Sequence, residues 1–61
     1  MNIGRFIHDA LWQLKMTRAE LGAELGKTPE TISNWINGES EPRASEYEKI
    51  KAMIKEQADN A

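Results

Sequence analysis

Residues 17–38 read TRAELGAELGKTPETISNWING, a stretch that contains the signals for two short helices, one directly after the other. The first helix begins with a capping box, because the Thr17 hydroxyl can accept a backbone N–H and the Glu20 carboxylate can reach back to the Thr17 N–H. Gly26 ends this helix, since glycine adopts the left-handed conformation at no steric cost. Thr28 then caps a second helix that has proline at its first position. Two helices joined by so short a turn must cross steeply, as in a helix-turn-helix.

The residues before this stretch predict one further helix. Apolar side chains recur at steps of three and four from Ile3 to Leu14, the spacing of one face of an α-helix, and Asn2 is placed to cap it. Trp12 and His8 fall beside this apolar stripe. In the central stretch, Gly22 weakens its helix, and the expected compensation is close packing of the backbone against a neighbouring helix.

The residues after it predict a last helix. Pro42 marks an extended connection, and Ser45 and Glu48 form a second capping box that opens a helix over about 45–57. Residues 58–61 are expected to be a frayed tail. The inward-facing side chains of this helix are Tyr47, Ile50, Met53 and Ile54. No stretch has the pattern of a strand, so residues 1–61 are predicted to form one all-α domain of four helices, with a fifth as the alternative.

Composition narrows the functional classes. The chain has 61 residues and no cysteine, which excludes a disulfide framework and a zinc–thiolate site and is typical of intracellular proteins. No apolar run reaches the length of a membrane span, and the first residues lack the layout of a signal peptide. The formal net charge is −2, but the acidic excess lies in residues 39–61, whereas residues 1–38 are neutral. Net charge is therefore a weak argument against binding nucleic acid.

An enzymatic role is not expected. One histidine without cysteine provides no convincing nucleophile and base, and His8-Asp9 lacks the further ligands that a metal-dependent hydrolase needs. Glu46, Glu48 and Asp59 are interpreted as a solvated face. We therefore predict no cofactor, no metal and no small-molecule ligand.

The polar face of the helix after Thr28 is typical of a helix that reads DNA. Asn34 can pair with adenine, Glu30 can accept from cytosine, and Thr31 can hydrogen-bond or touch a thymine methyl. Phosphate contacts are expected from side chains around this face, namely Arg18, Lys27, Thr28, Asn37, Ser40 and Arg43. Each assignment has a simpler alternative. Thr28 is a helix cap in any case, Glu30 can favour the helix dipole alone, Arg18 and Arg43 can be solvated, and Trp35 is expected in the core.

The ordered motif Thr17-x-x-x-Leu21 … Leu25-Gly26 … Thr28-x-x-Thr31-Ile32-Ser33-x-Trp35-x-x-Gly38 … Pro42 resembles the Xre/Cro-type helix-turn-helix family of phage repressors and small bacterial regulators. The resemblance covers residues 7–54 and implies a lambda-repressor-like fold with residues 28–37 as the recognition helix. It places four residues at base edges, namely Pro29, Glu30, Thr31 and Asn34. It also implies dimerisation, often through the C-terminal helices, and the apolar residues available for such a contact are Met53, Ile54, Trp12 and Ile36.

The sequence departs from the family pattern at several positions. Glu39 and Glu41 replace common basic residues, Pro29 and Glu30 replace more usual readers, and Ile36 takes a place often held by glutamate. The predicted function is a cytoplasmic, nucleoid-associated regulator of bacterial or phage origin. It would act as a repressor and homodimer on a palindromic operator in double-stranded DNA, without membrane contact. The alternative is an adaptor or antitoxin-like interaction module with weak or no DNA binding, because a fold alone does not fix function.

Overall fold

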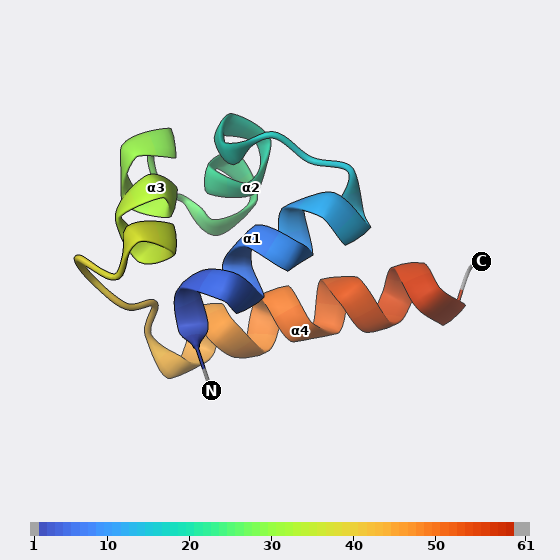
Figure 1. Ribbon diagram of the computed structural model, residues 1–61. Helices are drawn as coiled ribbons and strands as arrows, with labels where there is room; N and C mark the ends of the chain where they lie inside the picture. The colour runs from blue at the N-terminus through green and yellow to red at the C-terminus, as the bar shows by residue number, and fades with distance from the viewer. Residues whose placement is uncertain (1, 60–61) are drawn as a thin grey trace.

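The computed structural model describes residues 2–59 and contains four α-helices, with no strand in that part of the chain (Figure 1). The helices are α1 (Ile3–Leu14), α2 (Arg18–Leu25), α3 (Pro29–Asn37) and α4 (Ala44–Asp59). This confirms the predicted all-α, four-helix fold.

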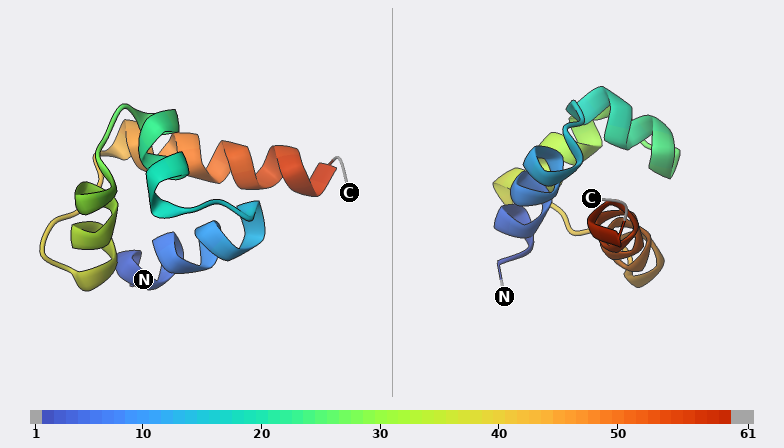
Figure 2. Two further views of the ribbon diagram at one scale, coloured as in Figure 1. Left: turned by 90° about the horizontal axis from the view of Figure 1, so that it is seen from above. Right: turned by 90° about the vertical axis from the view of Figure 1, so that its right-hand side faces the viewer.

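The core draws on all four helices. Its buried members are Ile7, Ala10, Leu21, Ile32, Trp35 and Ile50. Trp12, in contrast, is 74% exposed, as expected from its place beside the α1 stripe. Figure 2 shows α1 and α4 along two sides of the domain in the view from above, with α3 at one end.

Helix α1 has a defined cap at each end. The Asn2 side chain accepts the Arg5 N–H at 3.1 Å and caps its first turn. Lys15 ends the helix in the left-handed conformation, with φ of 54°. Residues other than glycine rarely adopt this conformation, so the sequence does not predict that the helix ends at Lys15.

A glycine that the sequence analysis did not single out sets the distance between α1 and α3. Gly4 is buried, and a Cβ atom at this position would overlap the Ile36 carbonyl oxygen and lie 3.2 Å from the Trp35 carbonyl oxygen. The backbones of the two helices therefore touch directly. Gly4 stands three residues before Ile7 on the apolar stripe, which is the sequence feature that marks it.

Helix α4 differs from the prediction at both ends. It begins at Ala44, and the Glu46 carboxylate accepts the Arg43 N–H at 2.8 Å, so the predicted capping box of Ser45 and Glu48 is wrong. The Arg43 carbonyl already accepts from Tyr47 N, which makes Arg43 the cap. The helix continues to Asp59, so Ala58 and Asp59 are helical, and residues 60 and 61 of the predicted tail lie outside the described residues.

Candidate nucleic-acid interface

Helices α2 and α3 are joined by a short turn, and local hydrogen bonds hold the start and the end of α2. The Thr17 capping box is complete, with Glu20 N to Thr17 Oγ1 at 3.1 Å and Thr17 N to Glu20 Oε1 at 2.8 Å. Gly26 closes α2 with φ of 70°, and Lys27 N donates to the Gly22 carbonyl at 2.7 Å. The predicted helix boundaries are confirmed here because each depends on neighbouring residues alone.

Gly22 is needed for this turn. A Cβ atom on Gly22 would lie 2.7 Å from the Lys27 carbonyl oxygen, closer than Cβ contacts in proteins come. The close backbone packing expected around this glycine is present, but its neighbour is the turn between α2 and α3 and not another helix. The glycine thus fixes how tightly the chain folds back between the two helices.

Helix α3 presents one polar side to the surface. Ile32 and Trp35 are buried, and this anchors the opposite side of the helix to the core. The predicted base readers lie on the outer side, where Pro29 and Glu30 are exposed and Thr31 and Asn34 are half-buried. Half-burial restricts the rotamers of the last two, so these side chains are held in place before any partner arrives.

The threonines at the start of α3 are engaged with each other. Thr28 Oγ1 accepts the Thr31 N–H at 3.2 Å and lies 3.0 Å from Thr31 Oγ1. Thr28 therefore caps the helix, as the simpler interpretation required. Its hydroxyl is oriented by Thr31, and a hydroxyl has enough acceptor capacity to take part in a further contact at the surface.

Arg18 is drawn toward α3 by a residue that the sequence analysis did not assign a role. Arg18 Nη1 donates to Ser33 Oγ at 3.3 Å, a contact between the first turn of α2 and the polar side of α3. The guanidinium therefore lies beside the predicted readers. No local pattern links positions 18 and 33, because only the crossing of the two helices brings them together.

Lys27 is already paired with an acidic residue. Its Nζ lies 3.0 Å from Glu46 Oε2, and the other oxygen of this carboxylate accepts the Arg43 N–H. The Arg43 N–H and then the Lys27 ammonium hold the pKa of Glu46 below its usual value. Two of the predicted phosphate ligands are thus tied to one carboxylate, Lys27 by its side chain and Arg43 by its backbone. A phosphate would have to compete with Glu46 for Lys27.

The other predicted phosphate ligands lie around the end of α3. Gly38 ends the helix with φ of 81°, and the Asn34 carbonyl accepts Glu39 N at 2.9 Å and Ser40 N at 3.4 Å. Asn37 and Ser40 are exposed, and so are Glu39 and Glu41, the acidic residues that replace common basic ones in the family pattern. This side of the surface therefore mixes phosphate ligands with negative charge.

The four dimer candidates do not form one patch. Met53 lines a hollow toward α2, whereas Ile54 lines a shallow pocket against the end of α1. Ile36 lies near the start of α1, and Trp12 near its end. Their apolar character is evident from the sequence, but their distribution over the surface depends on how the chain folds.

Residues 2–59 hold no cluster of three histidine, cysteine or acidic residues arranged to bind a metal ion. None of their helices combines the length and the apolar character that crossing a membrane requires.

A family model described as helix-turn-helix matches residues 8–52 of the chain. No curated protein and no solved structure gave a match.

Proposed function

This chain belongs to the Xre/Cro-like helix-turn-helix family, and from that premise we propose that it is a repressor that binds a palindromic operator as a homodimer. The observation that carries the proposal is the polar side of α3, held outward by Ile32 and Trp35 with Arg18 beside it. We assign its site of action to the cytoplasm of a bacterial cell, on chromosomal or phage DNA.

The proposed mechanism places α3 in the major groove. Asn34 reads adenine by two hydrogen bonds, Thr31 and Glu30 contact neighbouring bases, and Pro29 packs against base edges at the helix start. Arg18 contacts a phosphate next to the groove, since Ser33 directs its guanidinium toward this side of the molecule. The backbone contacts fix register, and the α3 side chains provide specificity.

One such helix reads only a few base pairs, which is the reason to propose a dimer. Two copies related by a two-fold axis would place their α3 helices about 34 Å apart, one turn of B-form DNA. Repression would follow from occupancy of the promoter.

The decisive experiment selects operator sequences from a random duplex pool. Anisotropy across a salt series, followed by sequencing of the bound fraction, is expected to show a steep salt dependence and an enriched palindrome. Asn34→Ala should lower affinity for the selected site by about 1–3 kcal/mol and relax one base position. Arg18→Ala should weaken binding to all sequences alike, and Lys55→Ala, the same charge change on exposed α4, serves as the control.

A second candidate function is a protein-interaction module that has lost DNA binding. It is favoured by the exposed Glu39 and Glu41 beside the end of α3 and by the pairing of Lys27 with Glu46. These acidic groups reduce the attraction for phosphate. A folded protein that binds no duplex at low salt would establish this alternative in place of the repressor.

A further inference from the structure

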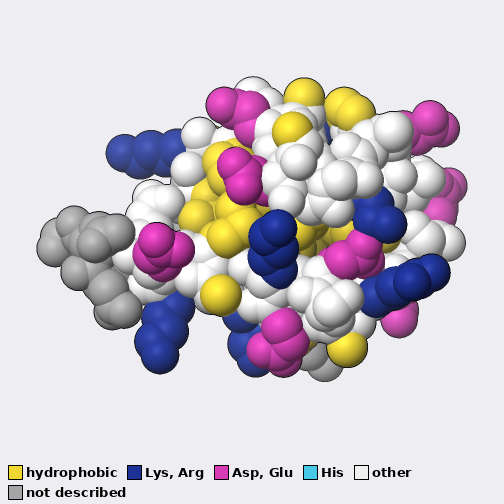
Figure 3. Space-filling model, turned by 180° about the vertical axis from the view of Figure 1, so that it is seen from behind, with side chains coloured by type: hydrophobic (Ala, Val, Ile, Leu, Met, Phe, Trp, Pro, Cys, Tyr) yellow, Lys and Arg dark blue, Asp and Glu magenta, His cyan; other side chains and the backbone are white. Residues whose placement is uncertain are grey.

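The domain has an apolar hollow on the side formed by α2 and α4. Helix α2 packs closely on α3, and α4 packs closely on α1, but α2 and α4 are not a closely packed pair. Between them lies a groove of about 400 Å³ lined by Leu14, Met16, Glu24, Met53, Glu56 and Gln57. In the view from behind, apolar side chains gather in the middle of the molecule, with a basic side chain lying across them and acidic ones nearby (Figure 3).

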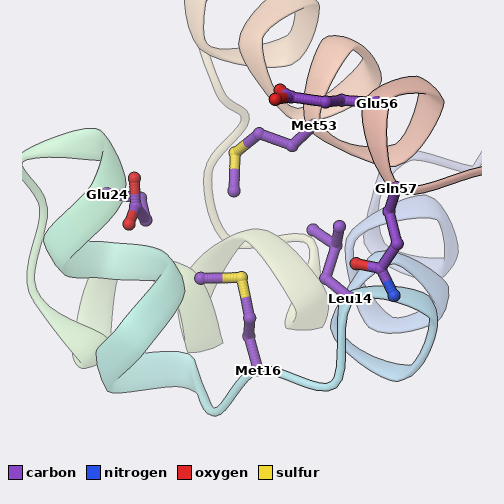
Figure 4. A pocket seen from close by; sticks show the side chains of 6 residues that line it. All are labelled: Leu14, Met16, Glu24, Met53, Glu56 and Gln57. Carbon is purple, nitrogen blue, oxygen red and sulfur yellow. The ribbon is translucent and has the colours of Figure 1, made fainter. Parts of the chain in front are cut away.

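The floor of this groove is adaptable. Met16 and Met53 extend into it from opposite sides, with Leu14 beside them at the end of α1 (Figure 4). All three are half-buried and pack against the core cluster. Methionine is unbranched and polarisable, so a surface lined with it can fit apolar side chains of varied shape.

The rim of the groove is acidic on both sides. Glu24 borders it from α2 and Glu56 from α4, and both residues are exposed. Lys49, from α4, donates to the Glu24 carbonyl at 2.9 Å, so its ammonium is held at the C-terminal end of α2. The α4 residues that line the groove run from Met53 to Gln57, a span of about 6 Å or one helical turn.

We propose that this groove binds a basic amphipathic helix of a second protein. Such a helix would lay leucine- or methionine-like side chains on the Met16 and Met53 floor, the helix-in-groove mode of recognition. Lysine or arginine side chains flanking that apolar face would lie against Glu24 and Glu56. The acidic rim therefore selects partners with the opposite charge.

The same charges argue against a second copy of this chain as the occupant. A two-fold contact is self-complementary, so it would bring Glu24 and Glu56 against the same acidic rim of the other copy. None of the groove residues is among the predicted DNA contacts. The domain could therefore hold DNA with α3 and a partner with this groove at once.

The test uses the methionine methyl groups as reporters. Protein labelled with ¹³C at the methionine methyls is titrated with a synthetic leucine–lysine peptide of about three helical turns. The expected result is saturable shifts of the Met16 and Met53 signals. The counterpart peptide with glutamate in place of lysine should leave both signals unchanged.

Two matched double variants separate the rim from general electrostatics. Glu24→Gln with Glu56→Gln should weaken peptide binding about tenfold, as expected for two rim charge pairs. Glu39→Gln with Glu41→Gln removes the same charge from the α3–α4 connection and should leave the affinity unchanged. Equal losses in both variants would overturn the proposal. So would the absence of methyl shifts, or shifts that follow protein concentration without peptide, which would identify a second copy as the occupant.

Discussion

The contact between α1 and α3 and the groove between α2 and α4 represent two opposite ways of bringing helices together. At the first, Gly4 lets backbone touch backbone, and the Trp35 side chain beside this contact is buried. At the second, Met16 and Met53 are half-buried and the space between the helices is unfilled. The comparison indicates that the domain fixes the helix proposed to read DNA and leaves adaptable apolar surface elsewhere.

A glycine explains the close contact between α1 and α3, and flexible methionines explain the adaptable surface between α2 and α4. A glycine removes all freedom in the distance between α1 and α3, because there is no side chain to rearrange. Long methionine side chains tolerate several positions of α4 relative to α2. Helix α4 is connected to the α2–α3 unit mainly near its own N-terminal end, through the Lys27–Glu46 ion pair and the Lys49 contact.

The largest effect is expected from the two tryptophans. Trp35 is 3% exposed and Trp12 is 74% exposed. Trp35→Ala should lower the free energy of unfolding by about 3–5 kcal/mol, through lost burial and the cavity left behind. Trp12→Ala should change it by less than about 0.5 kcal/mol. Urea unfolding followed by circular dichroism measures both, and similar losses in the two variants would contradict the assigned core.

The next largest effect tests the contact between α1 and α3. Gly4→Ala places a methyl group against the Ile36 carbonyl, so the helices must part, at a cost of about 1–3 kcal/mol. At an exposed helix position alanine is instead better than glycine by about 1 kcal/mol. Ala23→Gly, at an exposed position of α2, should show that preference as a loss. A Gly4→Ala protein with a raised melting temperature would mean that the two backbones are not in contact.

The same contrast explains what could be predicted from the sequence. The caps of α2 and α3 and the N-terminal cap of α1 are predicted correctly, because each depends on residues within three or four positions. Helix α4 was placed one residue late, because Ser45 and Glu48 fit the capping pattern. Glu46 instead reaches the Arg43 N–H and also pairs with Lys27, a residue 19 positions away in the chain. That distant partner is invisible to a local pattern.

The candidate site shows the same limit. The polar side of α3 follows from helical periodicity, and the family match supports a DNA-binding helix-turn-helix regulator in general. The contact of Arg18 with Ser33 and the neutralisation of Lys27 depend on how helices cross. The groove depends on the loose packing between α2 and α4, which no property of either sequence segment records.

A smaller effect tests the N-terminal end of α4, where Glu46 accepts the Arg43 N–H and pairs with Lys27. Glu46→Gln keeps an oxygen for the Arg43 N–H but loses the charge, and should cost about 0.5–1.5 kcal/mol at pH 7. The pKa of Glu46 is lowered in the folded protein, so its ionised form stabilises the fold above the pKa of an unfolded glutamate, about 4.3. This contribution is lost as the pH falls through the lower folded pKa. Unfolding curves between pH 7 and pH 2 should therefore converge for the two proteins at the acid end. Glu48→Gln, on the exposed side of α4, is the control and should show no such convergence.

The smallest effect is expected in the groove itself. Met53→Leu keeps the volume nearly constant, and since one side of Met53 faces unfilled space, the loss should be below about 0.5 kcal/mol. Ile50→Leu, one turn earlier on the same helix, changes the shape of a fully buried side chain and should cost about 1 kcal/mol. Melting temperatures measured under one condition rank the two variants. The reverse ranking would mean that Met53 is packed as tightly as the core and that the groove between α2 and α4 is not a loosely packed region.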